Sequence, residues 1–246
     1  MSHDTALDVA NALRAVSIPS DVALYQRFFK TGPGQYGEGD IFIGVKVPKN
    51  RLVAKRFRDL PEAEIDLLLH SDVHEERFCG LVILIERFKK ARTAAARGEH
   101  FQHYLDLVYE GRVNNWDLVD CSAPYFGDWL LDGAGRVSQN SMQLLRSLAS
   151  SEKLWERRVG IIFTFAFIRV GELAPTFEIA EQLLGDKHDL MHKAVGWMLR
   201  EAGKKDADAL REFLTRFAAI MPRTALRYSI EKFDEAERKS WLAFGK

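Results

Sequence analysis

Apolar residues recur at spacings of three and four along almost the whole chain, while the alternating pattern typical of strands is nearly absent. Leu, Ala, Glu, Arg and Lys dominate the 246 residues, and all five are good helix formers. The pattern therefore predicts an all-α protein. We expect helices at residues 5–16, 20–30, 48–58, 61–70, 73–92, 99–111, 115–132, 138–149, 153–170, 173–185, 188–203, 206–219, 222–233 and 234–243.

Prolines and glycines mark several boundaries of these helices. Pro48 and Pro61 suit first turns, whereas Gly98 and Gly171 suit helix ends. One segment, Thr31–Val47, has five glycines followed by a short alternating run. Because no partner strand is visible elsewhere, we expect this segment to be a structured loop.

A weak internal repeat points to the architecture. The phrases RFCG, LVD, RRVG and KAVG end at residues 80, 120, 160 and 196, in steps of 40, 40 and 36 residues. This period predicts an α-α superhelix, a HEAT-like repeat solenoid of about 12–14 helices in antiparallel pairs. A compact helix bundle, whose hairpins have a similar length, is the alternative. We expect residues 1–246 to form a single HEAT-like-repeat domain, with N-terminal helices and the glycine-rich loop in 1–47, core repeats in 48–235 and a C-terminal helix in 236–246.

Composition excludes several classes of protein. The chain is 47% hydrophobic and has 35 basic and 35 acidic residues, which excludes a disordered chain. No apolar stretch approaches the ~20 residues that span a bilayer. The start, MSHDTALDVANAL, does not resemble a secretory signal, and Cys79 and Cys121 resemble small buried hydrophobes of a reducing compartment. We therefore expect a cytoplasmic protein without a membrane partner. A nucleic-acid binder with zero net charge must concentrate its cations on one face.

Familiar catalytic and metal-binding motifs are absent from the sequence. There is no P-loop, no GxGxxG entering a helix, no HExxH and no CxxC. His188 and His192 have the i, i+4 spacing of a metal pair, but no third ligand lies nearby. We expect no metal site and no cofactor.

Tryptophans recur beside charged residues at matching places in the repeats. Trp116 and Asp120 are four residues apart near the start of one expected helix, which places both on one face. Asn114 or Asn115 suits the cap of that helix, and Asp117 suits its first turn. The next repeats contain two further pairs at a spacing of three, Trp155 with Arg158 and Trp197 with Arg200. Ordinary packing, with an Asp120–Arg158 ion pair, also explains this pattern.

Longer phrases then carry a resemblance to a known family. NNWDLVDCSAPYFGDWL (Asn114–Leu130), LWERRVGIIF (Leu154–Phe163) and KAVGWMLREAGK (Lys193–Lys204) resemble the DNA alkylation repair family, as do GVKVPKNRLVAK (Gly44–Lys55) and MPRTALRYSIEKF (Met221–Phe233). The resemblance covers about residues 20–235. It implies a helical-repeat fold with a concave DNA-binding face, and monofunctional DNA glycosylase action on purines alkylated at nitrogen 3 or 7.

The resemblance also implies roles for individual residues. The family's catalytic carboxylate falls on Asp120, its two lesion-flanking aromatics on Trp116 and Trp197, and its essential arginine on Arg158. Contacts of the family with DNA correspond to Arg51 and Arg200. A tyrosine of the family aligns near Phe28, which lacks the hydroxyl group. Val47–Pro48 replaces a threonine–proline phrase, and the glycine-rich segment is longer than usual. If DNA binds, one electropositive stripe is expected to include Arg51, Arg158, Lys193, Arg200, Lys204, Arg223 and Arg227.

These residues suit the excision of a cationic purine. Such a base is already a good leaving group, so the main requirement is a carboxylate beside the electron-poor sugar, a role that suits Asp120 as the one acidic residue of the tryptophan ridge. The expected partner is double-stranded DNA carrying alkylated purines, bound by a monomer in a groove without a deep base pocket. Two alternatives are a non-catalytic binder of damaged or branched DNA and a HEAT-type protein–protein scaffold.

Overall fold

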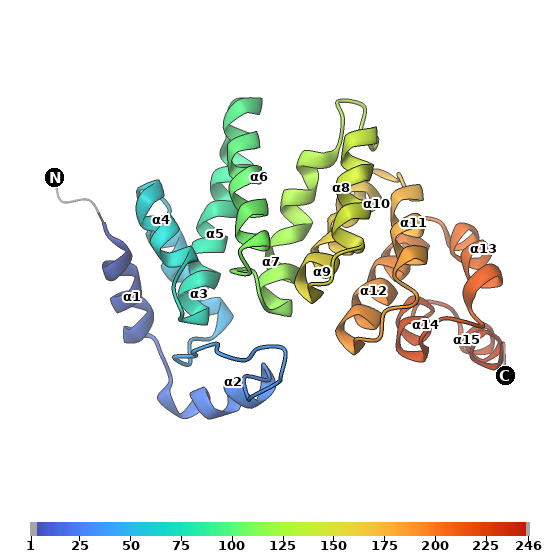
Figure 1. The fold of residues 1–246 in the computed structure, drawn as a ribbon, viewed down its shortest axis with the longest axis horizontal. Coiled ribbons are helices and arrows are strands. Elements are labelled where there is room, and N and C mark those ends of the chain that lie inside the picture. The colour runs from blue at the N-terminus through green and yellow to red at the C-terminus, as the bar shows by residue number, and fades with distance from the viewer. Residues whose placement is uncertain (1–3, 245–246) are drawn as a thin grey trace. The chain divides into compact units, whose positions relative to one another are not determined.

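The computed structural model describes residues 4–244, and their regular secondary structure is helical (Figure 1). The described part of the chain contains no strand, only two isolated bridges, at Ile41–Val73 and Leu131–Val137. The α-helices are α1 (Ala6–Ala15), α2 (Val22–Phe28), α3 (Val47–Arg56), α4 (Glu62–Leu69), α5 (His74–Lys90), α6 (Ala94–Tyr109), α7 (Trp116–Phe126), α8 (Gln139–Ala149), α9 (Leu154–Phe163), α10 (Phe165–Val170), α11 (Ala174–Gln182), α12 (Asp189–Lys205), α13 (Ala207–Phe217), α14 (Arg223–Ser229) and α15 (Glu235–Ala243). Short 3-10 helices are η1 (Pro19–Asp21) and η2 (Gly127–Leu130). The all-α prediction is confirmed.

Some predicted boundaries were wrong. Gly98 does not end a helix but lies inside α6, which starts earlier because Thr93 Oγ1 accepts a hydrogen bond from the Ala96 amide at 3.2 Å. An interior glycine costs only about 1 kcal/mol, and the buried face of α6 offsets it. The expected helix 153–170 is two helices, α9 and α10, divided at Thr164. The C-terminal helix begins at Glu235, and positions 245–246 of the predicted helix lie outside the described residues.

The chain divides into two compact units, one ending at Ser122 and one beginning at Ala123. In the first unit, α3 and α4 pack against the long α5, which also packs against α6. In the second unit, α8 packs against α9, and α12 contacts α9, α11, α13 and α14. Both units are thus built from helices packed against their neighbours in the chain, and the expectation of one repeat domain over 1–246 stays a prediction.

The internal repeat is visible in matching hydrogen bonds. Ahead of α5, Ser71 Oγ donates to Glu76 Oε2 at 2.7 Å, and Arg77 Nη1 donates to the Ser71 carbonyl at 2.8 Å. Two repeat steps later, ahead of α9, the same two bonds have lengths of 2.7 and 2.9 Å. They are made by Ser151, Glu156 and Arg157. The two helices therefore start with the same local structure.

Glycines in the repeat phrases mark close contacts between helices. A Cβ at Gly160 on α9 would lie 3.0 Å from Leu148 Cβ on α8. A Cβ at Gly196 on α12 would lie 2.5 Å from Tyr228 Cβ and 2.6 Å from the Ala225 carbonyl oxygen on α14. At Gly196 only a residue without a Cβ allows so close an approach, whereas at Gly160 a Cβ would require its neighbours to shift slightly.

The glycine-rich segment is a structured loop, as expected, and Glu75 at the start of α5 fastens it. The buried Glu75 carboxylate accepts hydrogen bonds from the backbone amides of Ile43, Gly44 and Val45 at 3.1, 2.8 and 3.1 Å. The Ile41 carbonyl accepts another from the His74 amide at 2.8 Å. Together these bonds hold the loop over the first turn of α5.

Within residues 4–244, no helix is both long enough and apolar enough to cross a bilayer.

Candidate functional site

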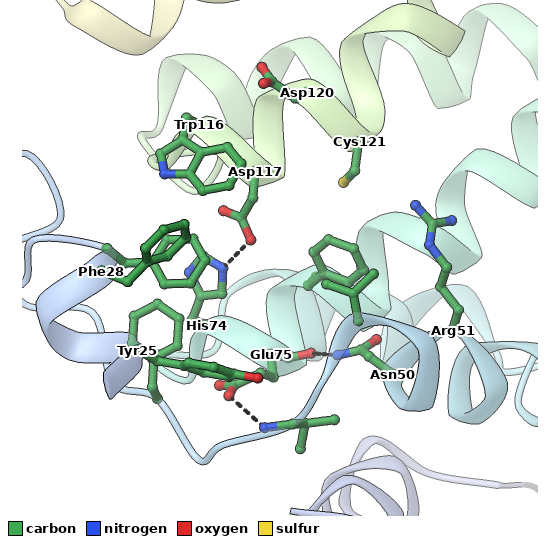
Figure 2. Close-up of a pocket in the computed structure, with 15 residues that line it drawn as sticks. Tyr25, Phe28, Asn50, Arg51, His74, Glu75, Trp116, Asp117, Asp120 and Cys121 are labelled. Carbon is green, nitrogen blue, oxygen red and sulfur yellow. Dashed lines mark hydrogen bonds and ion pairs between the residues drawn. The ribbon is translucent and has the colours of Figure 1, made fainter. Parts of the chain in front are cut away.

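A cavity of about 450 Å³ lies in the first unit, between α2, the glycine-rich loop, α3, α5 and α7 (Figure 2). Its walls are mostly aromatic and aliphatic, with a few charged groups. The lining residues are Tyr25, Phe28, Phe29, Phe42, Val45, Val47, Asn50, Arg51, His74, Glu75, Phe78, Trp116, Asp117, Asp120 and Cys121. The cavity forms because α2 and the glycine-rich loop lie beside α5 and α7, and the expectation that DNA is bound without a deep base pocket stays a prediction.

Stacked rings hold Trp116 in the cavity wall. Trp116 stacks on Phe29 at a centroid distance of 5.4 Å and an interplanar angle of 15°, and Phe29 stacks on Phe42 at 4.8 Å. The edge of Phe28 meets Trp116 at 5.8 Å. Phe28 itself is 59% exposed. The indole therefore has a fixed orientation, and Phe28 leaves an aromatic surface open to solvent beside it.

Helix α7 carries both central residues of the predicted site. Asn115, fully buried just before the helix, accepts a hydrogen bond from the Trp116 amide at 2.9 Å through Oδ1. Trp116 and Asp120 are one turn apart and both line the cavity, as their spacing predicts. Asp120 is half-buried at the rim (Figure 2). The structure thus brings Trp116, Asp120, Phe28 and Arg51 to one cavity.

Sequence reasoning missed a buried charged network that forms part of this wall. His74 Nε2 donates to Asp117 Oδ2 at 2.8 Å, and His74 Nδ1 donates to Asp40 Oδ2 at 3.0 Å. Burial alone would lower the pKa of His74, but Asp117 and Asp40 outweigh it and raise that pKa to about 9. His74 is therefore an imidazolium at neutral pH, held between two carboxylates.

Asp40, the carboxylate of this network that is farther from Trp116 in the chain, also pairs with Arg77. Arg77 donates to Asp40 Oδ1 and, at 3.0 Å, to Asn114 Oδ1. Burial would raise the pKa of Asp40, but His74 and Arg77 keep it below its ordinary value. Asp117 lines the same cavity as Asp120, so Asp120 is not the only carboxylate in this wall. The only sequence signal was the position of Asp117 directly after Trp116.

Arg51 and Cys121 line the cavity away from Phe28 (Figure 2). The exposed Arg51 guanidinium lies 5.6 Å from the centroid of the Phe78 ring. Burial raises the pKa of the Cys121 thiol well above its ordinary value. Cys121 is therefore a neutral thiol, unsuited to act as a nucleophile, whereas Arg51 brings a positive charge to this part of the wall.

The second unit holds the other two residues assigned to catalysis. Arg158 on α9 is only 4% exposed, and its guanidinium donates to the Leu190 carbonyl in the first turn of α12. Trp197 on α12 is half-buried, with its ring centroid 6.3 Å from that of Phe165. Since α9 and α12 pack together, this unit brings both residues to neighbouring helices.

Most predicted DNA-binding cations of the second unit have a partner already. Glu201 accepts from Arg200 at 3.1 Å and from Lys204 at 2.7 Å, and Arg200 also pairs with Glu231. The remaining contacts are Lys193 with Asp189 at 2.6 Å and Arg223 with the Leu242 carbonyl at 2.7 Å, while Arg227 is exposed. Bound phosphates would have to compete with these carboxylates.

The two histidines with metal-pair spacing have structural contacts. His188 Nδ1 accepts from the Leu190 amide at 3.2 Å and caps α12, and His192 Nε2 lies 2.6 Å from the Asp186 carbonyl oxygen. Among residues 4–244, no group of three or more His, Cys, Asp or Glu side chains is arranged to hold a metal ion.

Comparisons with known proteins agree with this arrangement of helices. The family model described as DNA alkylation repair enzyme matches residues 9–233. A solved structure described as a predicted DNA alkylation repair enzyme from Enterococcus faecalis is 15% identical, has a TM-score of 0.65, and is matched over 89% of this chain and 97% of that chain. No curated protein matches the chain. The match over most of its length shows that the chain belongs to the DNA alkylation repair enzyme family.

Proposed function

We propose that the protein is a monofunctional DNA glycosylase that excises purines alkylated at nitrogen 3 or 7 from duplex DNA. The observation that supports this most is the placement of Trp116 and Asp120, one turn apart at an aromatic cavity, in a chain of the DNA alkylation repair family. The proposed enzyme acts as a cytoplasmic monomer, without metal or cofactor.

Asp120 has the main chemical role in this proposal. As the glycosidic bond breaks, the deoxyribose acquires oxocarbenium character, and a carboxylate nearby stabilises that charge. At about 4 Å and an effective dielectric constant near 20, the attraction is about 4 kcal/mol. A transition-state stabilisation of this size corresponds to roughly a thousandfold in rate. Asp120 also aligns the attacking water.

A general acid is not required for this reaction. An alkylated purine leaves as a neutral base because it is cationic before the bond breaks. His74 is not suited to supply a proton, since both of its ring nitrogens bind carboxylates. Its role is instead to neutralise Asp117 in the wall of the cavity.

The remaining predicted residues bind the DNA. Trp116 and Trp197 contact the deoxyribose of the lesion, and each indole face attracts the developing charge by about 0.5–2 kcal/mol. Arg158 binds an adjacent phosphate through its planar guanidinium, which for this purpose turns away from the Leu190 carbonyl. Phe28 contacts the lesion region. The further DNA contacts are Arg51, Lys193, Arg200, Lys204, Arg223 and Arg227.

Comparing a cationic with a neutral damaged base tests the proposed chemistry. Duplexes that each carry one 7-methylguanine or one uracil are incubated with the protein, and base release is read as strand cleavage at the abasic site after alkali. We expect release of 7-methylguanine and very little release of uracil. Efficient release of uracil would contradict the proposal. Tight binding of the alkylated duplex without release of either base would instead favour a non-catalytic damage binder.

A further inference from the structure

We infer that His74 is a positioning residue of the proposed reaction, which fixes Trp116 through both of its neighbours in the sequence and through the ring of Phe29. This inference rests on the proposed function, in which Trp116 contacts the sugar of the lesion. It goes beyond that function, because it assigns a part in the reaction to a side chain that is itself buried and paired.

The residues on either side of Trp116 both belong to the buried network. Asp117, directly after it, accepts a hydrogen bond from His74 Nε2 at 2.8 Å. Asn115, directly before it, donates through Nδ2 to Asp40 Oδ2 at 3.3 Å, and the same oxygen accepts from His74 Nδ1 at 3.0 Å. Asn115 Oδ1 in turn accepts from the Trp116 amide at 2.9 Å. The backbone of Trp116 is therefore fixed from both sides by groups that His74 links.

A row of rings fixes the indole by a second route. Trp116 stacks on Phe29, whose ring centroid lies 5.2 Å from that of His74. Phe42 stacks on both Phe29 and His74, at 4.8 and 4.4 Å. Because hydrogen bonds at both nitrogens fix the His74 ring, the phenylalanines packed on it have a rigid support. Phe29 thus links the orientation of His74 to that of the indole.

His74 can hold two carboxylates because it is an imidazolium. Both of its ring nitrogens donate, whereas a neutral imidazole has a single N–H group. Of the other charged groups nearby, Arg77 on α5 donates to the second oxygen of Asp40, and the Glu75 carboxylate is turned to the loop amides. A glutamine at position 74 has its donors on one atom and no charge, so it cannot hold both carboxylates in this way.

The position of Trp116 matters to the proposed chemistry more than to DNA binding. A displacement of about 1 Å at a site of reaction can cost on the order of 100-fold in rate. Trp116 and Asp120 are one turn apart on α7, so a shift at the start of this helix moves both. The proposed phosphate contacts lie on other helices. A loss of excision rate without a matching loss of DNA affinity is therefore the expected sign of positioning.

Two substitutions interrupt the contacts of Trp116 with this network. His74→Gln removes the cation and its ring, whereas Phe29→Leu removes only the ring between His74 and Trp116. His103→Gln makes the first change at a half-buried histidine of α6. Phe177→Leu makes the second change at a half-buried phenylalanine of α11, which stacks on another ring at 5.4 Å.

A third control separates positioning from stability. Leu13 is fully buried on α1, so Leu13→Ala destabilises the same unit outside the network. Circular dichroism and thermal melting define a temperature at which the proteins compared are folded, and all assays are made there. Under these conditions a purely structural role of His74 has no effect on the folded enzyme.

The orientation of Trp116 is measured without reference to catalysis. Each protein is labelled with 5-fluorotryptophan, and the fluorine NMR signal of Trp116, one of five tryptophans, is assigned with Trp116→Phe. We expect one sharp Trp116 signal in the wild type and the three controls, and a broadened or divided signal in His74→Gln and Phe29→Leu. One sharp signal in folded His74→Gln or, if that variant does not fold, in Phe29→Leu would overturn the inference.

Single-turnover excision of 7-methylguanine from a duplex gives the second measurement. We expect His74→Gln and Phe29→Leu to lose roughly tenfold or more in rate, while their affinity for an undamaged duplex stays close to that of the controls and Leu13→Ala excises at the wild-type rate. Excision by folded His74→Gln at the wild-type rate would overturn the inference and leave the glycosylase intact. If the wild type releases no base, the proposed function fails, and the Trp116 signals alone decide whether His74 positions the indole.

Discussion

His74 has a buried, charged environment that no local sequence pattern indicates. Its ring lies between Asp40 and Asp117 and also stacks on Phe42 at 4.4 Å. A buried ion pair contributes little when formed but costs about 3–5 kcal/mol when one partner is removed. The imidazolium thus holds the loop, α5 and α7 together directly behind Trp116.

The pH dependence of stability follows from the raised pKa of His74. With that pKa near 9 in the folded chain and 6.5 without its partners, His74 contributes about 3 kcal/mol of stability. The contribution is fully present below pH 6.5 and is lost as the pH rises through 9. We expect His74→Gln to lower the free energy of unfolding by about that amount at neutral pH and to flatten its decline from neutral to alkaline pH. Urea titrations over this range measure it.

A matched histidine serves as the control for that experiment. His103 is half-buried and lies 3.1 Å from Asp66, so His103→Gln makes the same chemical change outside the network. A pH profile of His74→Gln that matches those of His103→Gln and the wild type would contradict the assignment of His74 as a buried cation.

Some residues of the candidate site could be predicted from the sequence and others could not. Trp116 and Asp120 could be predicted from the sequence, because one helix positions both and the spacing determines their common face. The contacts among Asp40, His74 and Asp117 could not be predicted, because these residues meet only when a loop and two helices come together. No local pattern links three positions so distant in the chain. The cavity was missed for the same reason.

The glycine-rich loop is the element on which the cavity depends most. Three successive amides, from Ile43 to Val45, point to one carboxylate, that of Glu75. We expect Glu75→Gln to weaken this anchor by about 2 kcal/mol, since an amide NH2 group faces backbone donors that need an acceptor. Hydrogen exchange of these three amides should become faster, while exchange in α12 stays unchanged. Unaltered exchange of the loop amides would contradict this role of Glu75.

Helix α12 shows why the repeat phrases contain glycine. A methyl group at Gly196 would overlap atoms of Tyr228 and Ala225 on α14. We expect Gly196→Ala to lower the free energy of unfolding by about 2 kcal/mol. Gly185, whose added Cβ would meet no atom within 4 Å, provides the control. Equal unfolding midpoints for Gly196→Ala and Gly185→Ala would show that α12 and α14 do not need this close contact.

At the level of elements, helix existence was predictable and helix boundaries less so. The spacing of apolar residues identified most helices because each buries one face. It could not reveal the division at Thr164, since α9 and α10 continue one apolar pattern across it. The early start of α6 depends on the Thr93 cap, which outweighs Gly98. The glycine-rich loop was recognisable, but not the carboxylate that anchors it.

The whole chain has no net charge, yet DNA is its proposed partner. In the second unit, the predicted cations Arg200 and Lys204 both pair with Glu201. If they bind phosphates, removing the Glu201 charge should release Lys204 and leave Arg200 with Glu231 as its remaining carboxylate partner. Because such pairs contribute only about 0.2–1 kcal/mol each, we expect Glu201→Gln to increase affinity for duplex DNA by roughly two- to fivefold. Fluorescence anisotropy at several salt concentrations measures this, with a steeper loss of affinity as salt rises.

A second charge-removing variant completes that comparison. Glu235 pairs with Lys239 on α15, so Glu235→Gln changes the net charge equally but outside the predicted contacts. If Glu201→Gln and Glu235→Gln raise affinity by the same amount, only overall charge matters, and Arg200 and Lys204 lose their assigned role.

The central claim is that the Asp120 carboxylate stabilises the sugar as the base departs. Single-turnover excision of 7-methylguanine tests it most directly, using Asp120→Asn and, as a control, Asp106→Asn, an exposed carboxylate of α6 in the same unit. The account predicts that Asp120→Asn lowers the excision rate roughly a thousandfold while DNA affinity and unfolding midpoint stay close to those of the control. Excision by Asp120→Asn at the rate of Asp106→Asn would contradict the account.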